Sequence, residues 1–145
     1  MARMTELRRS AQRMARYILY AYVDGYDLDG IAADLEAAFA SFIASRQWQS
    51  GKASFVSQRG KEEEKKGDLP RWDLGLNLEL RDSKGERSAH FADVEEIAIF
   101  LRSQSEKFKR EFILGVLDLQ GSDTWEFAFI DDSPVNIERI RRALT

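Results

Sequence analysis

The amino-acid sequence predicts one α+β domain, in which about five mostly antiparallel strands form a sheet and three to four helices pack mostly on one face. Three observations support this prediction. Some segments alternate apolar and polar residues, whereas others repeat apolar residues every three or four positions. Short turn signals separate neighbouring strand segments, which favours antiparallel pairing. The length of 145 residues suits a single unit, residues 1–145, with the expected order (α)βαββαββα.

The composition excludes several classes of chemistry. The chain has no cysteine and one histidine, His90, which excludes disulfides, thiolate metal sites and cysteine nucleophiles and leaves little for histidine chemistry. No apolar run approaches the roughly 20 residues that span a bilayer. The N-terminal arginines are followed by no apolar stretch typical of a signal peptide. We therefore expect a cytoplasmic protein without a cofactor or a bound metal.

The N-terminal segment contains two expected elements. Residues 5–16 predict a helix, which is either a stable element or a flexible lead-in, because chain termini are often poorly ordered. Residues 17–23 (YILYAYV) form one continuous aromatic and β-branched run. Periodicity alone does not separate a strand from a continuation of the helix there. We favour a strand, since Tyr, Ile and Val suit sheets better.

An amphipathic helix is expected over residues 27–47, with Asp27 or Asp29 capping its start. Its apolar residues recur at spacings of three and four, and they are Ile31, Leu35, Ala38, Phe39, Phe42 and Ile43. Trp48 is expected to pack at the C-terminal end of this helix. Residues 53–57 then predict a short strand.

Residues 72–80 alternate Trp72 and four leucines with polar residues or glycine, which predicts a half-buried strand. Its polar face would meet water or another chain. The preceding residues 59–71 include Leu69 as their one apolar side chain apart from Pro70, so they predict a mobile, charged loop. Residues 82–85 predict a turn.

A second helix is expected over residues 92–109. The acidic residues Asp93, Glu95 and Glu96 would lie in its first turn and basic residues in its last, the order that the helix dipole favours. Its apolar face is formed by Val94, Ile97, Ala98, Leu101 and Phe108, with Phe100 beside it.

The C-terminal part predicts a hairpin and a last helix. Residues 112–117 and 125–130 are apolar strands joined by a short loop, so they are expected to pair as antiparallel neighbours. Ser133 fits the N-cap of the last helix and Pro134 fits its first position. The inward side chains of that helix would be Ile137, Ile140 and Leu144.

Catalytic motifs give little support for an enzyme. The chain contains no phosphate-binding loop, no G-x-G-x-x-G and no G-x-S-x-G. The remaining enzymatic alternative is a small metal-dependent hydrolase or nuclease that uses the strand-end carboxylates Asp118, Asp131 and Asp132. It requires these three side chains to converge within about 5 Å of one point, as oxygen ligands of a cation do.

The sequence instead favours a binding protein. Three Trp, nine Phe and four Tyr are more aromatic residues than a core of this size must hide. Acidic residues also crowd the ends of the C-terminal strands, which suits a basic protein partner. The predicted partner-binding residues are Asp118, Asp123, Trp125, Glu126, Asp131 and Asp132. The alternative is that the aromatic residues are core and that the acids only keep the surface solvated.

Nucleic acid and membranes are not expected partners. A protein that binds a nucleic-acid duplex needs a basic face, whereas this chain has a net charge of −3. A basic cluster in residues 1–16 and a mixed-sign stretch at residues 61–66 are the two candidates for such a face. We interpret the first as the polar face of a helix and the second as a solvated turn.

Three segments resemble a known group of proteins. They are YAYVDGYDLDGIAADLEAAFASFIASRQW, LPRWDLGLNLEL, and ADVEEIAIFLRSQSEKFKREFILGVLD together with WEFAFIDDSP. Their order resembles that of the small cytosolic α+β immunity proteins of bacterial polymorphic toxin systems. This resemblance implies a protein that binds a cognate toxin stoichiometrically and blocks its active site. It carries over no contact residue. A further alternative is a homo-oligomeric adaptor, for instance a homodimer, with the strand 72–80 at the sheet edge.

Overall fold

The computed structural model describes residues 17–25, 28–59, 72–80, 88–121 and 124–144. In chain order its elements are β1 (Tyr17–Val23), α2 (Ala32–Ala44), β2 (Ala53–Arg59), β3 (Trp72–Leu80), α3 (Ser88–Phe108), β4 (Phe112–Asp118), β5 (Thr124–Ile130) and α4 (Ile137–Leu144). The predicted N-terminal helix, nearly all of the charged loop 59–71 and the turn at residues 82–85 lie outside the described residues. The predicted α+β class and the order of the elements from residue 17 onward are confirmed.

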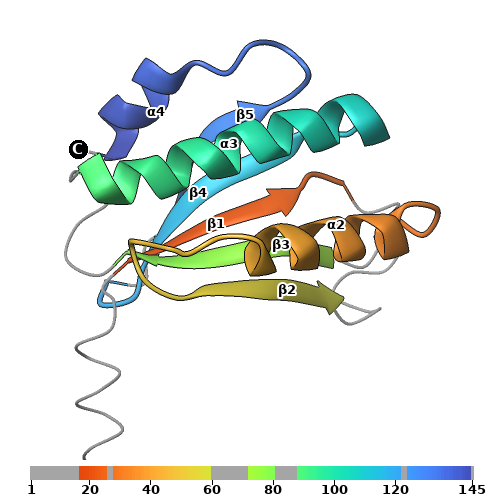
Figure 1. Ribbon diagram of the computed structural model, residues 1–145, viewed down its shortest axis with the longest axis horizontal. Coiled ribbons are helices and arrows are strands. Elements are labelled where there is room, and N and C mark those ends of the chain that lie inside the picture. Colours follow the sequence, from red (N-terminus) through yellow and green to blue (C-terminus); the bar gives the residue numbers. More distant parts are fainter. Residues whose placement is uncertain (1–16, 26–27, 60–71, 81–87, 122–123, 145) are drawn as a thin grey trace, which may run out of the picture.

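The five strands form one antiparallel sheet in the order β2-β3-β1-β4-β5. The strand β1 lies at its centre, paired with β3 on one side and β4 on the other (Figure 1). The ambiguous run 17–23 is therefore a strand. The strand β3 is paired on both sides, so the expectation that residues 72–80 form a sheet edge is wrong. The edges belong to β2 and β5.

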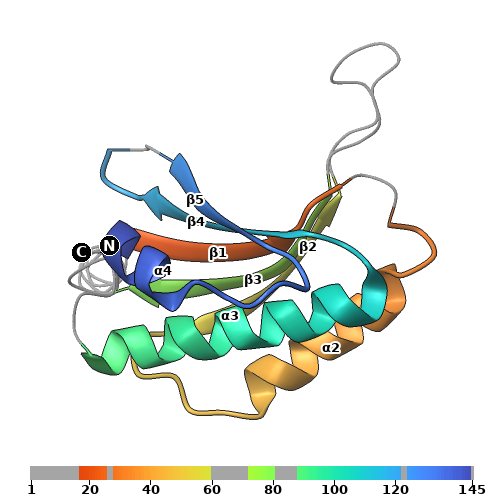
Figure 2. The same cartoon turned by 90° about the horizontal axis from the view of Figure 1, so that it is seen from above.

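All three described helices lie on one face of the sheet (Figure 2). The helix α2 contacts β2 and β3, while α3 and α4 contact β5. Leucines of β3 that the alternation predicts to be buried are fully enclosed beneath these helices, as are apolar residues of β1 and β4. None of the described helices combines the length and apolar character that crossing a membrane would require.

Aromatic side chains hold the two long helices together over the sheet. The rings of Phe42 and Phe100 stack with centroids 4.1 Å apart and an interplanar angle of 2°. Phe39 meets Phe100 edge-on at 5.1 Å and lies 6.1 Å from Phe112 of β4. Trp48 packs against Phe42 and donates its indole N–H to the Ile43 carbonyl, as its predicted position implies. This column accounts for many of the aromatic residues, as the core alternative expected.

Asp93 is the buried charge that fixes the connection between α2 and β2. Its carboxylate is fully enclosed and accepts hydrogen bonds from Arg46 Nη2 at 2.9 Å, Gln49 N at 2.8 Å and both Ser50 N and Ser50 Oγ at 2.7 and 2.9 Å. The prediction placed Asp93 in the first turn of a helix starting at residue 92. That start is wrong, because α3 begins at Ser88, which puts Asp93 in the second turn. Its hydrogen bonds to Gln49 and Ser50 show that the carboxylate faces the loop after α2.

Two predicted helix caps are also wrong. The helix α2 begins after Ile31 without a side-chain cap, so Asp29 does not cap it, and Asp27 lies outside the described residues. The helix α4 begins at Ile137, and Asn136 Oδ1 accepts the Arg139 backbone N–H at 3.0 Å. Asn136, rather than Ser133, is therefore the N-cap of α4.

Candidate functional site: the open face of the sheet

The second face of the sheet carries no helix among the described residues, and we call it the open face. Its side chains form cross-strand rows that follow from the strand registers. One row runs Asn77, Tyr20, Gly115, Glu126, and the next runs Glu79, Ile18, Leu117, Thr124. A third row runs Gly75, Tyr22, Ile113, Phe129. Tyrosine and aliphatic residues thus occupy positions that in a solvated sheet would be mostly polar.

A β-bulge decides which side chain of β5 reaches this face. Leu114 pairs with Ala128, but the next residue, Gly115, pairs with Glu126, so Phe127 is the extra residue of β5. Regular pairing would have placed Phe127 opposite Gly115. The bulge places Glu126 there instead, and Phe127 packs partly buried against the core. The sequence pattern of residues 125–130 predicts an unbroken alternation, which is wrong at this point.

The open face is hollowed next to the bulge. A pocket of about 190 Å³ is lined by Ile18, Tyr20, Tyr22, Asn77, Leu117, Thr124 and Glu126. The Tyr20 and Tyr22 rings lie with centroids 5.2 Å apart, and Tyr22 Oη donates to Asn77 Oδ1 at 2.6 Å. A Cβ atom at Gly115 would lie 2.3 Å from Tyr20 Cζ, so the glycine provides the space that the Tyr20 ring occupies.

The open face is acidic among its described strand positions. Asp73, Glu79 and Glu126 lie at strand positions on this side, and no lysine or arginine with a described side chain does so within the paired strands. The exposed Lys52 lies just before β2, where its backbone hydrogen-bonds to Glu79. Glu126 is exposed and makes no hydrogen bond or ion pair with the part of the chain that the structure describes. Phe129, in the same strand, is 56% exposed. The surface combines aromatic area with negative charge.

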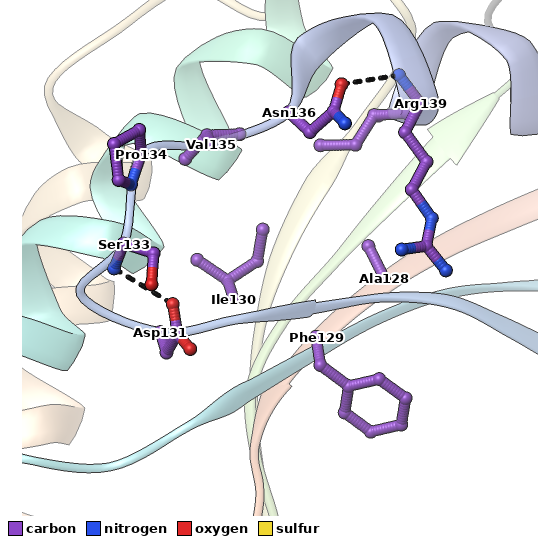
Figure 3. Close-up of a pocket in the computed structure, with 10 residues that line it drawn as sticks. Ala128, Phe129, Ile130, Asp131, Ser133, Pro134, Val135, Asn136 and Arg139 are labelled. Atoms are coloured by element: carbon purple, nitrogen blue, oxygen red, sulfur yellow. Dashed lines mark hydrogen bonds between the residues drawn. The ribbon is translucent and has the colours of Figure 1, made fainter.

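A second hollow, of about 240 Å³, lies at the start of α4 (Figure 3). It is lined largely by apolar side chains of β5 and of the loop after it, with Asp131 on one side and Arg139 on the other. Asp131 Oδ1 accepts the Ser133 backbone N–H at 2.9 Å. The backbone and side chain of Ser133 both lower the pKa of Asp131 by hydrogen bonding to its charged form. Because a carboxylate and a guanidinium line the same hollow, it favours neither an anionic nor a cationic ligand. We therefore take the open face as the candidate functional site.

The structure does not gather the predicted site residues into one patch. Asp118 is buried at the end of β4, and its Oδ1 accepts the backbone N–H groups of Gln120 and Gly121, which is the role of a turn residue. Asp131 and Asp132 are exposed just beyond the opposite end of the hairpin. Asp123 and the side chain of Trp125 lie outside the described residues.

The same register bears on the metal alternative. Phe112 to Asp118 spans six residue steps, or about 20 Å of strand. Asp118 and the pair Asp131 and Asp132 therefore do not converge on one cation, which corrects that expectation. Among the described residues, no group of three or more His, Asp or Glu side chains is placed to hold a metal ion.

Sequence reasoning missed Tyr20, Tyr22 and Asn77 as site residues. Their signal was present, because tyrosines two positions apart in a strand share a face. Glycines inside strands 72–80 and 112–117 also mark places where a side chain or another backbone comes close. A Cβ atom at Gly75 would lie 1.8 Å from the Ala21 carbonyl oxygen, and one at Gly115 would meet Tyr20.

Comparisons with known proteins leave the open face as the basis for any functional argument. Scans against protein-family models, curated proteins and solved structures each found no match for this chain.

Proposed function

We propose that this protein is a non-enzymatic inhibitor, an immunity protein that neutralises a cognate toxin by binding it one to one and occluding its active site. The open face is the proposed contact surface. Its partly exposed tyrosines and Phe129 supply the aromatic anchors that protein interfaces favour. The observation that carries the proposal is the coincidence of these aromatic groups with carboxylates on a face that no described helix covers.

The charge of this face indicates the chemistry of the partner. Asp73, Glu79 and Glu126 would repel an acidic surface and attract a basic one, which raises the rate of association and excludes wrong partners. A basic surface is common around the active sites of enzymes that act on phosphate-rich substrates, since such substrates carry negative charge. Covering that surface with a rigid acidic sheet would block access to it.

Two double variants with the same chemical changes on opposite sides of the molecule test this proposal. The first joins Phe129→Ser to Glu126→Lys on the open face. The second joins Ile99→Ser to Glu106→Lys on α3, where Ile99 is 51% exposed and Glu106 is also exposed. Because all four side chains are exposed, each substitution should change the free energy of unfolding by less than about 1 kcal/mol.

The measurement is affinity capture of the partner from the lysate of the encoding organism, followed by titration of the purified pair. We expect the wild type and the α3 variant to hold one stoichiometric partner with equal affinity, and the open-face variant to bind it at least about tenfold more weakly. The partner, expressed alone, should arrest the growth of a host, and the wild-type protein but not the open-face variant should restore growth.

Other results would contradict specific parts of the proposal. A partner that is held equally by the open-face variant would place the contact elsewhere. A partner without toxicity would leave a binding protein that is not an immunity protein. A stable homodimer as the only complex would favour the adaptor alternative. Asp131→Lys with Asp132→Lys, tested in the same titration, would show whether the contact extends to the loop before α4.

A further inference from the structure

We propose that the pocket beside the β5 bulge is a receptor for one arginine side chain of the partner, which stacks on the tyrosines and pairs with Glu126. This inference rests on the proposed function, because it names the group that the open face would recognise in a basic partner. Four features carry it: the size of the pocket, its aromatic lining, a carboxylate that has no partner among the described residues, and the bulge that puts the carboxylate there.

The volume of the pocket sets the scale of its ligand. At about 190 Å³ it is smaller than the roughly 300–1,000 Å³ of pockets that hold drug-sized ligands. A single inserted side chain matches this scale better than a cofactor or a nucleotide. The aliphatic Ile18 and Leu117 in the lining suit the methylene stem of a long side chain, whose charged end would reach the polar groups.

The side chains that line the pocket favour a cationic group, and a planar guanidinium over an ammonium. Tyr20 and Tyr22 present ring surfaces with a negative quadrupole, which attracts cations within about 6 Å of a ring centroid. Guanidinium is more weakly hydrated than ammonium and stacks on aromatic faces, so arginine loses less on entering such a pocket than lysine does. A carboxylate can also accept two parallel N–H bonds from guanidinium.

Glu126 is the acid that such a ligand would meet. It lines the pocket, is exposed, and makes no hydrogen bond or ion pair with the residues that the structure describes. It stands in the same cross-strand row as Tyr20, with Gly115 between them. Because Gly115 has no side chain, the Tyr20 ring lies over it, in the direction of the pocket. The carboxylate and the ring are thereby brought to one place without a third side chain between them.

The bulge indicates that the position of Glu126 beside the tyrosines is a specific feature of this sheet. If β5 paired regularly with β4, Phe127 instead of Glu126 would lie opposite Gly115, and this row of the open face would contain no acid from β5. Bulges commonly re-aim side chains beside functional sites. Here the bulge removes an aromatic ring from the open face and delivers a carboxylate in its place.

The test is an NMR titration of the full chain with capped tripeptides, acetyl-Gly-Xaa-Gly-amide, where Xaa is arginine, lysine or citrulline. Citrulline has the shape of arginine without its charge. We expect the arginine peptide to shift the ring signals of Tyr20 and Tyr22 saturably, with at least about fivefold weaker binding of lysine and none of citrulline. Comparing the spectrum of Tyr20→Phe with that of the wild type assigns the ring signals to Tyr20 and Tyr22.

Variants then locate the binding. Glu126→Gln keeps the shape of the side chain and should weaken the arginine peptide at least about tenfold, since it removes the paired charge. Glu106→Gln, an equal change on exposed α3, should leave binding unchanged. Gly115→Ala should also weaken binding, because its new methyl group would displace the Tyr20 ring. Equal binding by Glu126→Gln, equal binding of citrulline, or no ring shift at the highest soluble peptide concentration would overturn the proposal.

The outcomes separate this inference from the proposed function. If the arginine peptide binds but no toxin is captured, the pocket stands and the immunity function fails. If a toxin is captured through the open face and Glu126→Gln leaves its affinity unchanged, the function stands and the arginine receptor fails.

Discussion

The two faces of the sheet are built from the same five strands but for different purposes. The helix-covered face contains fully enclosed leucines, a column of aromatic rings and the enclosed carboxylate of Asp93, which accepts four hydrogen bonds. The open face carries partly exposed tyrosines, a protruding Phe129 and a Glu126 without a described partner. The comparison indicates that the free energy of folding comes mostly from the helix-covered face, so the side chains of the open face are less constrained by folding.

Replacing one phenylalanine by alanine on each side of the sheet should give the largest difference in the free energy of unfolding. Phe39→Ala removes a fully buried ring that contacts both Phe100 and Phe112, and should lower the free energy of unfolding by about 3–5 kcal/mol. Phe129→Ala removes a ring that is 56% exposed and should cost less than about 1 kcal/mol. Urea unfolding of both variants measures the gap. Equal losses would mean that the open face is part of the core.

The next test compares two acids that approach the same arginine from α3. Asp93→Ala removes the buried acceptor that Arg46 shares with the donors of Ser50, so we expect a loss of about 3 kcal/mol, the lower end of the range because Arg46 is partly exposed. Glu96 lies 3.8 Å from Arg46 but is half exposed, and Glu96→Ala should cost about 0.5 kcal/mol or less. Thermal and urea unfolding check both values. A small effect of Asp93→Ala would show that the loop is not anchored by this carboxylate.

Substitutions at two glycines of the open face compare a rigid neighbour with a mobile one. A methyl group at Gly75 would meet the Ala21 backbone, which has little freedom to move, so Gly75→Ala should cost about 3 kcal/mol or more. At Gly115 the obstacle is the end of the Tyr20 side chain, which can turn away, and Gly115→Ala should cost only about 1 kcal/mol. Chemical unfolding measures both. The reverse ranking would place the rigid contact at Tyr20 instead.

Tyr22→Phe is a smaller test on the same face. It removes the hydrogen bond to Asn77 Oδ1 while leaving the ring in place, and should cost about 1 kcal/mol. Asn77→Ala in the Tyr22→Phe background should cost less than it does in the wild type, because the shared bond is already lost. Additive losses in this cycle would show that the two side chains are energetically independent.

The smallest expected effect is a pH dependence at Asp131. Its pKa is lowered by hydrogen bonds from Ser133, so its contribution to stability is present above the ordinary aspartate pKa and disappears as the pH falls through the lowered one. Asp131→Asn can keep the turn but cannot titrate, and should therefore flatten that part of the acid unfolding curve. An unchanged curve would assign the acid sensitivity to other carboxylates.

Local patterns in the sequence sufficed for most of the fold. The leucines of β3 and the apolar stripes of α2 and α3 are each legible within one segment, because periodicity reports which side chains face a core. Two features lay beyond such patterns. The donors that Asp93 binds are 43 to 47 residues away in the chain. The last helix is capped by Asn136 instead of the predicted Ser133, because it begins at Ile137 and not at Pro134.

The candidate site was harder to predict than the fold. Asp118, Asp131 and Asp132 all follow neighbouring strands, but β4 and β5 are antiparallel, so Asp118 and Asp131 are separated by the length of β4. Glu126 reaches the pocket through a bulge that a regular alternation of Trp125, Phe127 and Phe129 conceals. The tyrosines of β1 were assigned to a buried strand, and their outward face became meaningful only when the helices proved to lie on the other side.

The bulge at Phe127 also divides β5 into two parts that can change independently. After the bulge, Ala128 and Ile130 are buried against the core, while before it Thr124 and Glu126 are exposed, and the extra residue absorbs the change of register between the two parts. Under the proposed function, insertions or substitutions near the hairpin tip would change the contact surface while the strand pairing that holds the buried Ala128 and Ile130 is kept. The bulge would thus allow an immunity protein to change its specificity without changing the fold on which it is built.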